Sequence, residues 1–129
     1  MKLADAETFI EECAETALVM ASRSIAEVVA AIGAKGYSVK GACVLLSSGR
    51  PLPALEKILA AHPLIHTAEG EFFRNAVRKG CESCGLKVRA IREREVASDD
   101  PLIAELGKLV GPPWRQDEKL CAAAALAML

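Results

Sequence analysis

The sequence predicts an α/β fold: a small mixed or parallel sheet with helices packed on it, a long N-terminal helix and a helix-rich chain overall. Three observations lead to this prediction. Apolar residues recur at helical spacing over about residues 5–32, two short stretches have the pattern of strands, and helical patterns follow each of them. This order of elements is typical of sheets that carry helices. The length of 129 residues predicts a single α/β domain over 1–129.

The predicted N-terminal helix runs for about seven turns at 3.6 residues per turn. Gly33 and Gly36 follow it, as glycines commonly follow helix ends. Two alternatives remain open: Ser22-Arg23-Ser24 would divide the helix, with Ser24 as the cap of a second helix, or residues 16–21 would form a third strand. A helix of this length needs a long packing partner. We therefore expect a homo-oligomer that forms through this helix, or a helix that packs along the whole domain.

The strand patterns cover residues 37–46 and 86–96. The first becomes uniformly apolar, as in a central strand that is covered on both faces, and the second is more polar and nearer an edge. The other predicted helices are a short one after Pro53 that ends near Ala61, and helices over about 68–84, 101–110 and 114–129. Thr67 is the expected N-cap of the second of these, and Asp99 or Asp100 of the third. Trp114 is expected to cover an edge of the core.

Composition narrows the function classes. The formal net charge is −1, which argues against binding nucleic acid through bulk electrostatics. Residues 1–7 lack the apolar core of a signal peptide, and no uninterrupted apolar run reaches the length of a membrane span, so we expect a cytoplasmic protein without a membrane partner. The five cysteines then indicate free thiols. Cys81 and Cys84 form a CxxC motif near a helix C-terminus, where the dipole disfavours the thiolate. These two and the other cysteines, which occupy apolar positions, are predicted to be small core residues: Cys13, Cys43 and Cys121.

Glu69 is the leading candidate for a catalytic group, with His66 beside it. Counting back along the apolar stripe of the 68–84 helix places Glu69 on that stripe, so its carboxylate is predicted to point inward, where burial would perturb it. His66 would then act as a general base next to it. The alternatives are a first-turn glutamate stabilised by the helix dipole and a histidine that packs in a loop. His62 lies four residues before His66, but Pro63 argues against a shared helix face, and a zinc pair would need further ligands.

A small anionic ligand or substrate is expected beside these two residues. Hydroxyls, a glycine and a guanidinium suit a phosphate or carboxylate, and they follow the most apolar strand. The predicted ligand-binding residues are Ser47, Ser48, Arg50 and Arg74. A plain turn is the alternative for 47–51, because neither the spacing of a P-loop nor that of a nucleophile elbow is present. The sequence does not identify a cofactor or decide whether the chain is an enzyme.

The second half of the chain resembles the later part of RNase H-like resolvase folds. The apolar strand at 42–46, the run Ile91-Arg92-Glu93-Arg94 and Asp117 ahead of an alanine-rich helix carry the resemblance. It implies a metal-dependent nuclease-type domain, with Glu69, Glu93 and Asp117 as alternative metal ligands. The aspartate of that family's first strand has no counterpart, because a helix is predicted there, and the two-metal site then lacks its centre. Three hypotheses result: an anion-binding α/β domain, a non-catalytic oligomerisation or interaction module, and a degenerate nuclease-like domain.

Overall fold

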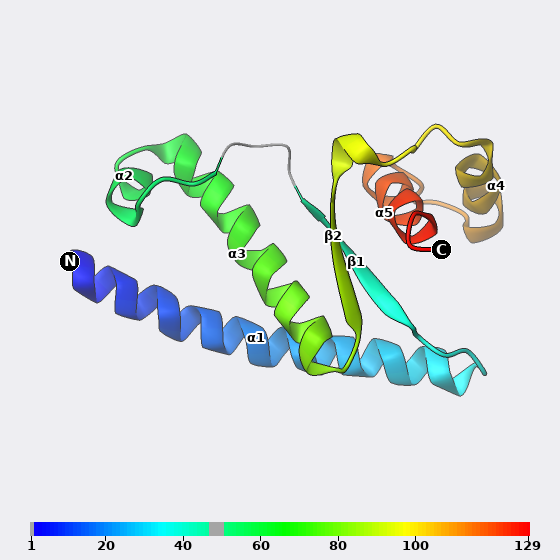
Figure 1. Ribbon diagram of the computed structural model, residues 1–129, viewed down its shortest axis with the longest axis horizontal. Coiled ribbons are helices and arrows are strands. Elements are labelled where there is room, and N and C mark those ends of the chain that lie inside the picture. The colour runs from blue at the N-terminus through cyan, green and yellow to red at the C-terminus, as the bar shows by residue number, and fades with distance from the viewer. Residues whose placement is uncertain (1, 47–50) are drawn as a thin grey trace. The chain divides into compact units, whose positions relative to one another are not determined.

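Figure 1 shows the computed structural model of the chain, which describes residues 2–46 and 51–129. The chain is 67% helical, with a two-stranded parallel sheet and a long N-terminal helix, so the α/β prediction is confirmed. The elements in order are α1 (Leu3–Ala34), β1 (Gly41–Leu46), α2 (Leu55–Leu59), α3 (His62–Ser83), β2 (Lys87–Arg92), a 3₁₀ turn (Glu93–Glu95), α4 (Pro101–Val110) and α5 (Gln116–Leu126). The chain, whose length predicted one domain, divides into two compact units. We call them the helical unit (α1, α2, α3) and the sheet unit (β1, β2, α4, α5).

The long helix α1 is continuous, as its apolar spacing predicted, so the alternatives of a break at residues 22–24 and of a strand at 16–21 are both wrong. The physical reason lies in how α1 packs on α3. An ideal Cβ on Gly80 would lie 3.1 Å from the backbone carbon of Ala21 and 3.0 Å from Cδ1 of Ile25, so the two helices approach closely at this point. The hydroxyl of Ser22 is 2.8 Å from that of Ser83. Ser22 therefore pairs with the neighbouring helix, and Ser24 lies inside α1 instead of capping a new helix.

Helices α1 and α3 run in the same general direction within the helical unit and converge towards the end of α3 (Figure 1). Their close contact is near the C-terminus of α3, where the Cys84 thiol also donates to the carbonyl of Ser22 at 3.4 Å. Towards the start of each helix the two diverge, and α2 lies at this wider end (Figure 1). The wider end is where the candidate site forms.

Helix α3 begins at His62, six residues before the predicted start. Pro63 is in its first turn, where a missing N–H costs nothing and the fixed φ suits a helix. The prediction that Thr67 caps the helix is therefore wrong: Thr67 is inside it, and its hydroxyl donates to the Pro63 carbonyl at 3.1 Å. The predicted end is close to the observed one, because Gly85 follows with a φ of +78°.

In the sheet unit, α5 packs against β1, and α4 packs against α5. The buried side chains of this unit come from both strands and both helices: Val44, Ile91, Ile103, Leu120, Ala123 and Ala124. Asp100 caps α4, because its side chain accepts from the Leu102 N–H at 2.9 Å, as the sequence predicted. Both strands are shorter than predicted. Residues 37–40 precede β1, and the 3₁₀ turn follows β2.

Trp114, the single tryptophan of the chain, lies over α4. A Cβ added to Gly107 would overlap its indole ring, so the ring rests directly on the helix backbone at that glycine. The indole Nε1 is buried and has no hydrogen-bond partner among the described residues. Trp114 therefore packs its indole on α4 just before α5 begins, in agreement with the predicted role as a cover of the core.

Candidate functional site

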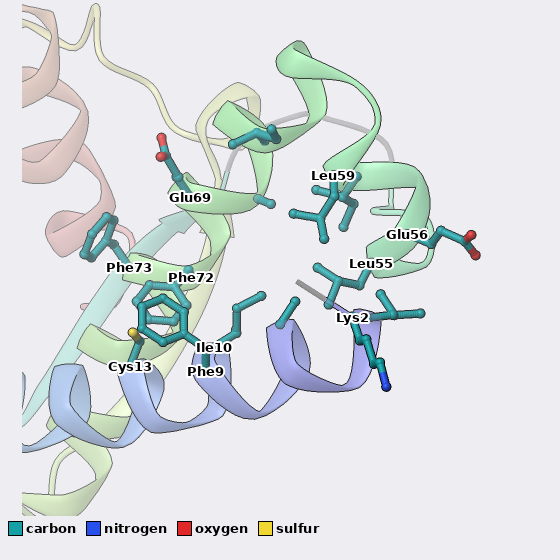
Figure 2. Close-up of a pocket in the computed structure, with 15 residues that line it drawn as sticks. Lys2, Phe9, Ile10, Cys13, Leu55, Glu56, Leu59, Glu69, Phe72 and Phe73 are labelled. Carbon is teal, nitrogen blue, oxygen red and sulfur yellow. The ribbon is translucent and has the colours of Figure 1, made fainter.

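An apolar cavity of about 920 Å³ lies in the helical unit, between the first halves of α1 and α3 and the short helix α2 (Figure 2). We call it the apolar groove. Aliphatic and aromatic side chains from all three helices line most of it: Leu3, Ala6, Phe9, Ile10, Cys13, Leu55, Ile58, Leu59, Ile65, Ala68, Phe72 and Phe73. The groove exists because α1 and α3 diverge here and α2 fills only part of the space between them. It is the candidate binding site of the helical unit.

The charged residues of the groove lie at its rim. Lys2, Glu56 and Glu69 complete the lining, and Figure 2 shows the ammonium group of Lys2 and both carboxylates pointing away from the apolar side chains. No charged group that the figure labels reaches the floor of the groove. Such a surface suits an apolar partner, because an anion placed here would lose its hydration without gaining a charged hydrogen-bond donor.

The predicted inward orientation of Glu69 is wrong. Its side chain is 60% exposed, and its carboxylate accepts a hydrogen bond from Nδ1 of His66 at 3.3 Å. The first-turn alternative fails as well, because α3 begins at His62 and has no acidic residue in its first turn. Glu69 lies at the border of the apolar stripe, where its long side chain covers apolar surface with its methylenes and extends its charged end to solvent.

His62 and His66 share a face of α3, contrary to the prediction from Pro63. Their Nε2 atoms are 3.0 Å apart, and the rings are nearly perpendicular, with centroids 4.5 Å apart. With Glu69 they form a hydrogen-bonded chain along one side of the helix. If Nδ1 of His66 carries the proton given to Glu69, its Nε2 is the acceptor and Nε2–H of His62 is the donor. The side chains of His66 and Glu69 are more than half exposed. A general base must lie within hydrogen-bond distance of a bound substrate, and this exposure keeps the imidazole of His66 accessible to one.

The predicted anion site is only partly described. Ser47, Ser48 and Arg50 lie outside the described residues, so their role stays a prediction. Arg74 is half-buried, and its guanidinium lies along its own helix: an ideal Cβ on Gly70 would be 3.0 Å from Nη1 of Arg74. Arg74 therefore lies over the backbone at Gly70. Within residues 2–46 and 51–129, the ion pair is formed by His66 and Glu69 and does not include Arg74.

The alternative metal ligands are distributed over both units. Glu69 belongs to the helical unit, whereas Glu93 is in the 3₁₀ turn and Asp117 is in the first turn of α5. All three are exposed. The described part of the chain contains no group of three or more histidines, cysteines or acidic residues that could hold a metal ion. The structure thus offers no support for a carboxylate metal centre.

The cysteines divide by exposure. Cys81 is buried, and burial raises the pKa of its thiol. Repulsion from Cys84 and Glu82 raises this pKa further. Cys121 is exposed, although its position predicted a core residue. Partial desolvation of its sulfur raises the pKa of this thiol too, as do the nearby carboxylates of Asp117, Glu118 and Glu93. Because both thiols resist ionisation, access to reagent decides which reacts first.

We expect alkylation of the native protein with iodoacetamide at pH 8 to label Cys121 at least about tenfold faster than Cys81, since the buried thiol reacts only when the helices open. Peptide mass spectrometry after timed quenching measures the two rates separately. Equal rates in the native protein would contradict the burial of Cys81. In urea the two rates should converge, which provides the control.

Helix α1 also has the length and hydropathy of a membrane-spanning helix, which the sequence did not predict. An 18-residue window within it has a mean hydropathy of 1.6, so α1 is long and apolar enough, by length and composition, to cross a membrane. Arg23 and Glu27 interrupt the apolar residues of α1, so the sequence contains no uninterrupted apolar run here. Soluble helices also pass this test, and the contacts of α1 with Gly80 and Ser83 of α3 show one face of it packed on protein.

The helical unit thus combines an apolar groove with a solvated chain of two imidazoles and a carboxylate on α3. The groove can take up apolar side chains, and the imidazole chain can exchange protons or offer nitrogen ligands. Comparison of the chain with protein families, with curated proteins and with solved structures found no significant match.

Proposed function

We propose that the chain is a non-catalytic interaction module that forms a homo-oligomer through its helical unit, with the apolar groove and the adjoining face of α1 covered by a second copy. One observation carries this proposal: α1 has 32 residues and none of them is buried. Isolated helices gain most of their stability from tertiary packing of an apolar face. A helix with this apolar content and no buried residue lacks part of its packing partner.

The core of the helical unit is small for its length. Its buried residues in the described ranges are Ile58, Ala76, Gly80 and Cys81, and only Ile58 has a large side chain. Large apolar side chains are instead exposed along α1 and α3: Leu3, Phe9, Val19, Met20, Val28, Phe73 and Val77. Large apolar side chains exposed in this number on two packed helices favour an interaction site. At 1.5 Å per residue α1 is about 48 Å long, and together with α3 it offers enough length for a standard interface of about 800 Å² per partner.

The charges of the helical unit favour a second copy as the occupant. The diverging end carries exposed carboxylates on both helices: Asp5, Glu7, Glu11, Glu12, Glu15 and Glu71. Exposed basic residues lie nearer the close contact of the helices: Arg23, Arg78 and Lys79. A copy related by a two-fold axis, with the two α1 helices antiparallel, places the acidic end of each beside the basic part of the other. A parallel arrangement would bring like charges together, so charge selects the antiparallel one.

A lipid bilayer is the competing occupant of the apolar face of α1, and the sequence of α1 disfavours it. Arg23 and Glu27 lie in the middle of the apolar segment from Ala17 to Ala34. A charged residue such as arginine costs about 2.5–3.5 kcal/mol at the centre of a spanning helix. Moreover, α3 packs on this segment and carries Arg78 and Lys79 beside the contact residue Gly80. A soluble helix–helix interface accommodates these charges at its edge at much smaller cost.

The test is the molar mass in solution. We expect light scattering after size exclusion to give a dimer at about 100 µM protein, and Phe9→Glu or Phe73→Glu to shift it to monomer, because each puts a charge into the desolvated interface. Phe9 and Phe73 are 57% and 62% exposed, so neither change disturbs the core of the unit.

Leu109→Glu is the matched control, because Leu109 is 84% exposed and lies on α4 of the sheet unit. It should leave the molar mass unchanged. A wild-type monomer at this concentration would overturn the proposal. So would sedimentation of the wild-type chain, but not of Phe9→Glu, with neutral phosphatidylcholine vesicles, since that result would assign the apolar face to a membrane.

A further inference from the structure

The geometry points to a binding site for a divalent transition-metal ion on the first two turns of α3, with Nε2 of His62 and Nε2 of His66 as its protein ligands. The two atoms are 3.0 Å apart. The residues are four positions apart on one helix, so the backbone holds both ligands on one face, one turn apart. This inference is independent of the proposed self-association.

The separation of the nitrogens indicates the class of ion. Metal–nitrogen bonds to imidazole are about 2.0–2.1 Å long, so nitrogens 3.0 Å apart subtend roughly 90–97° at the ion. This angle is close to the right angle between neighbouring ligands in square-planar and octahedral complexes and smaller than the tetrahedral angle. Ni²⁺ and Cu²⁺ favour such geometry with nitrogen ligands. The site therefore suits these ions better than Zn²⁺.

Glu69 has the role that a carboxylate commonly has behind a metal-binding histidine. Its Oε2 is 3.3 Å from Nδ1 of His66, the nitrogen that faces away from His62. Accepting the Nδ1 proton fixes the tautomer in which Nε2 carries the free lone pair, and it also orients the ring and increases its basicity. Glu69 is thus a positioning residue for the site and not itself a ligand.

The described residues provide two ligands, because no group of three or more potential ligands occurs among them. Water completes the coordination sphere in this form of the site. Open positions make the ion exchangeable and accessible to a further ligand from outside, in contrast to a closed structural site. The site is exposed at the rim of the apolar groove, to which Glu69 also belongs.

The test uses the full-length chain and Ni²⁺ alone, with calorimetric titration at neutral pH after removal of metals by chelator. We expect one Ni²⁺ per chain, no measurable binding by His62→Gln or His66→Gln, and binding about tenfold weaker by Glu69→Gln. Glu71→Gln is the matched control: it removes an exposed carboxylate from the same helix and should bind as the wild type does. Circular dichroism confirms that each variant retains the helix content of the wild type.

Thiols are the competing ligands, and absorption spectroscopy separates them from imidazoles. Nickel–thiolate complexes absorb in the near ultraviolet, and we expect no such band on saturation with Ni²⁺. Stoichiometric binding that persists in His62→Gln would overturn the inference. A thiolate band that disappears in Cys81→Ala or Cys84→Ala would do the same, as would the absence of binding by the wild-type chain.

Discussion

Gly107→Ala should destabilise the sheet unit by about 2–3 kcal/mol, although the same exchange strengthens most helices. A Cβ at this position would overlap the indole of Trp114, so the ring must leave the face of α4. Overpacking of this kind costs about 1–3 kcal/mol, and displacing a tryptophan loses further contacts. The helix propensity of alanine returns only about 1 kcal/mol. Urea unfolding followed by the fluorescence of the single tryptophan measures the change and also reports the new environment of the indole.

Gly33→Ala provides the control for this prediction. Gly33 is also in a helix, but a Cβ there has no atom within 4 Å, so the exchange should be neutral or stabilise the chain by up to about 1 kcal/mol. Unchanged stability and fluorescence in Gly107→Ala would contradict the packing of Trp114 on α4. A blue shift without loss of stability would mean that the ring finds another buried position.

Periodicity and capping residues predicted most of the fold. The apolar spacing of α1 and the Asp100 cap of α4 are local signals, because each acts over a few residues of the same helix. The start of α3 illustrates the limit of such signals. Pro63 has two opposite meanings, as a break before a helix or as a favoured residue of its first turn. The choice between them depends on how α3 packs on α1 and α2, which the local sequence does not contain.

The start of α3 determines which side chains of the candidate site share one face of the helix. A helix that began at residue 68, as predicted, would leave His62 and His66 outside it and would have Glu69 in its first turn. Starting it at His62 puts both histidines on one face and Glu69 in the third turn. The orientation of Glu69 has a second cause: a stripe position predicts where Cα lies, whereas a long side chain at the border of a stripe can still extend to solvent. The apolar groove needs α1, α2 and α3 together, and no single stretch of sequence predicts it.

Gly80→Val should have the second large effect, a loss of about 1–3 kcal/mol in the stability of the helical unit. An ideal Cβ on Gly80 already lies 3.1 Å from the backbone carbon of Ala21. The two methyl groups of valine would therefore require the helices to move apart. Urea unfolding monitored by circular dichroism at 222 nm measures the loss.

The matched control is Gly70→Val on the same helix, where a Cβ meets only the flexible end of Arg74, and its stability should be close to that of the wild type. Because the proposed dimer uses α1 and α3 as one surface, Gly80→Val should lose both stability and self-association, whereas Phe9→Glu should lose self-association alone. A Gly80→Val protein that remains dimeric at wild-type stability would show that the α1–α3 contact at Gly80 does not hold this surface together. A variant that loses stability but stays dimeric would assign the interface to surfaces outside the helical unit.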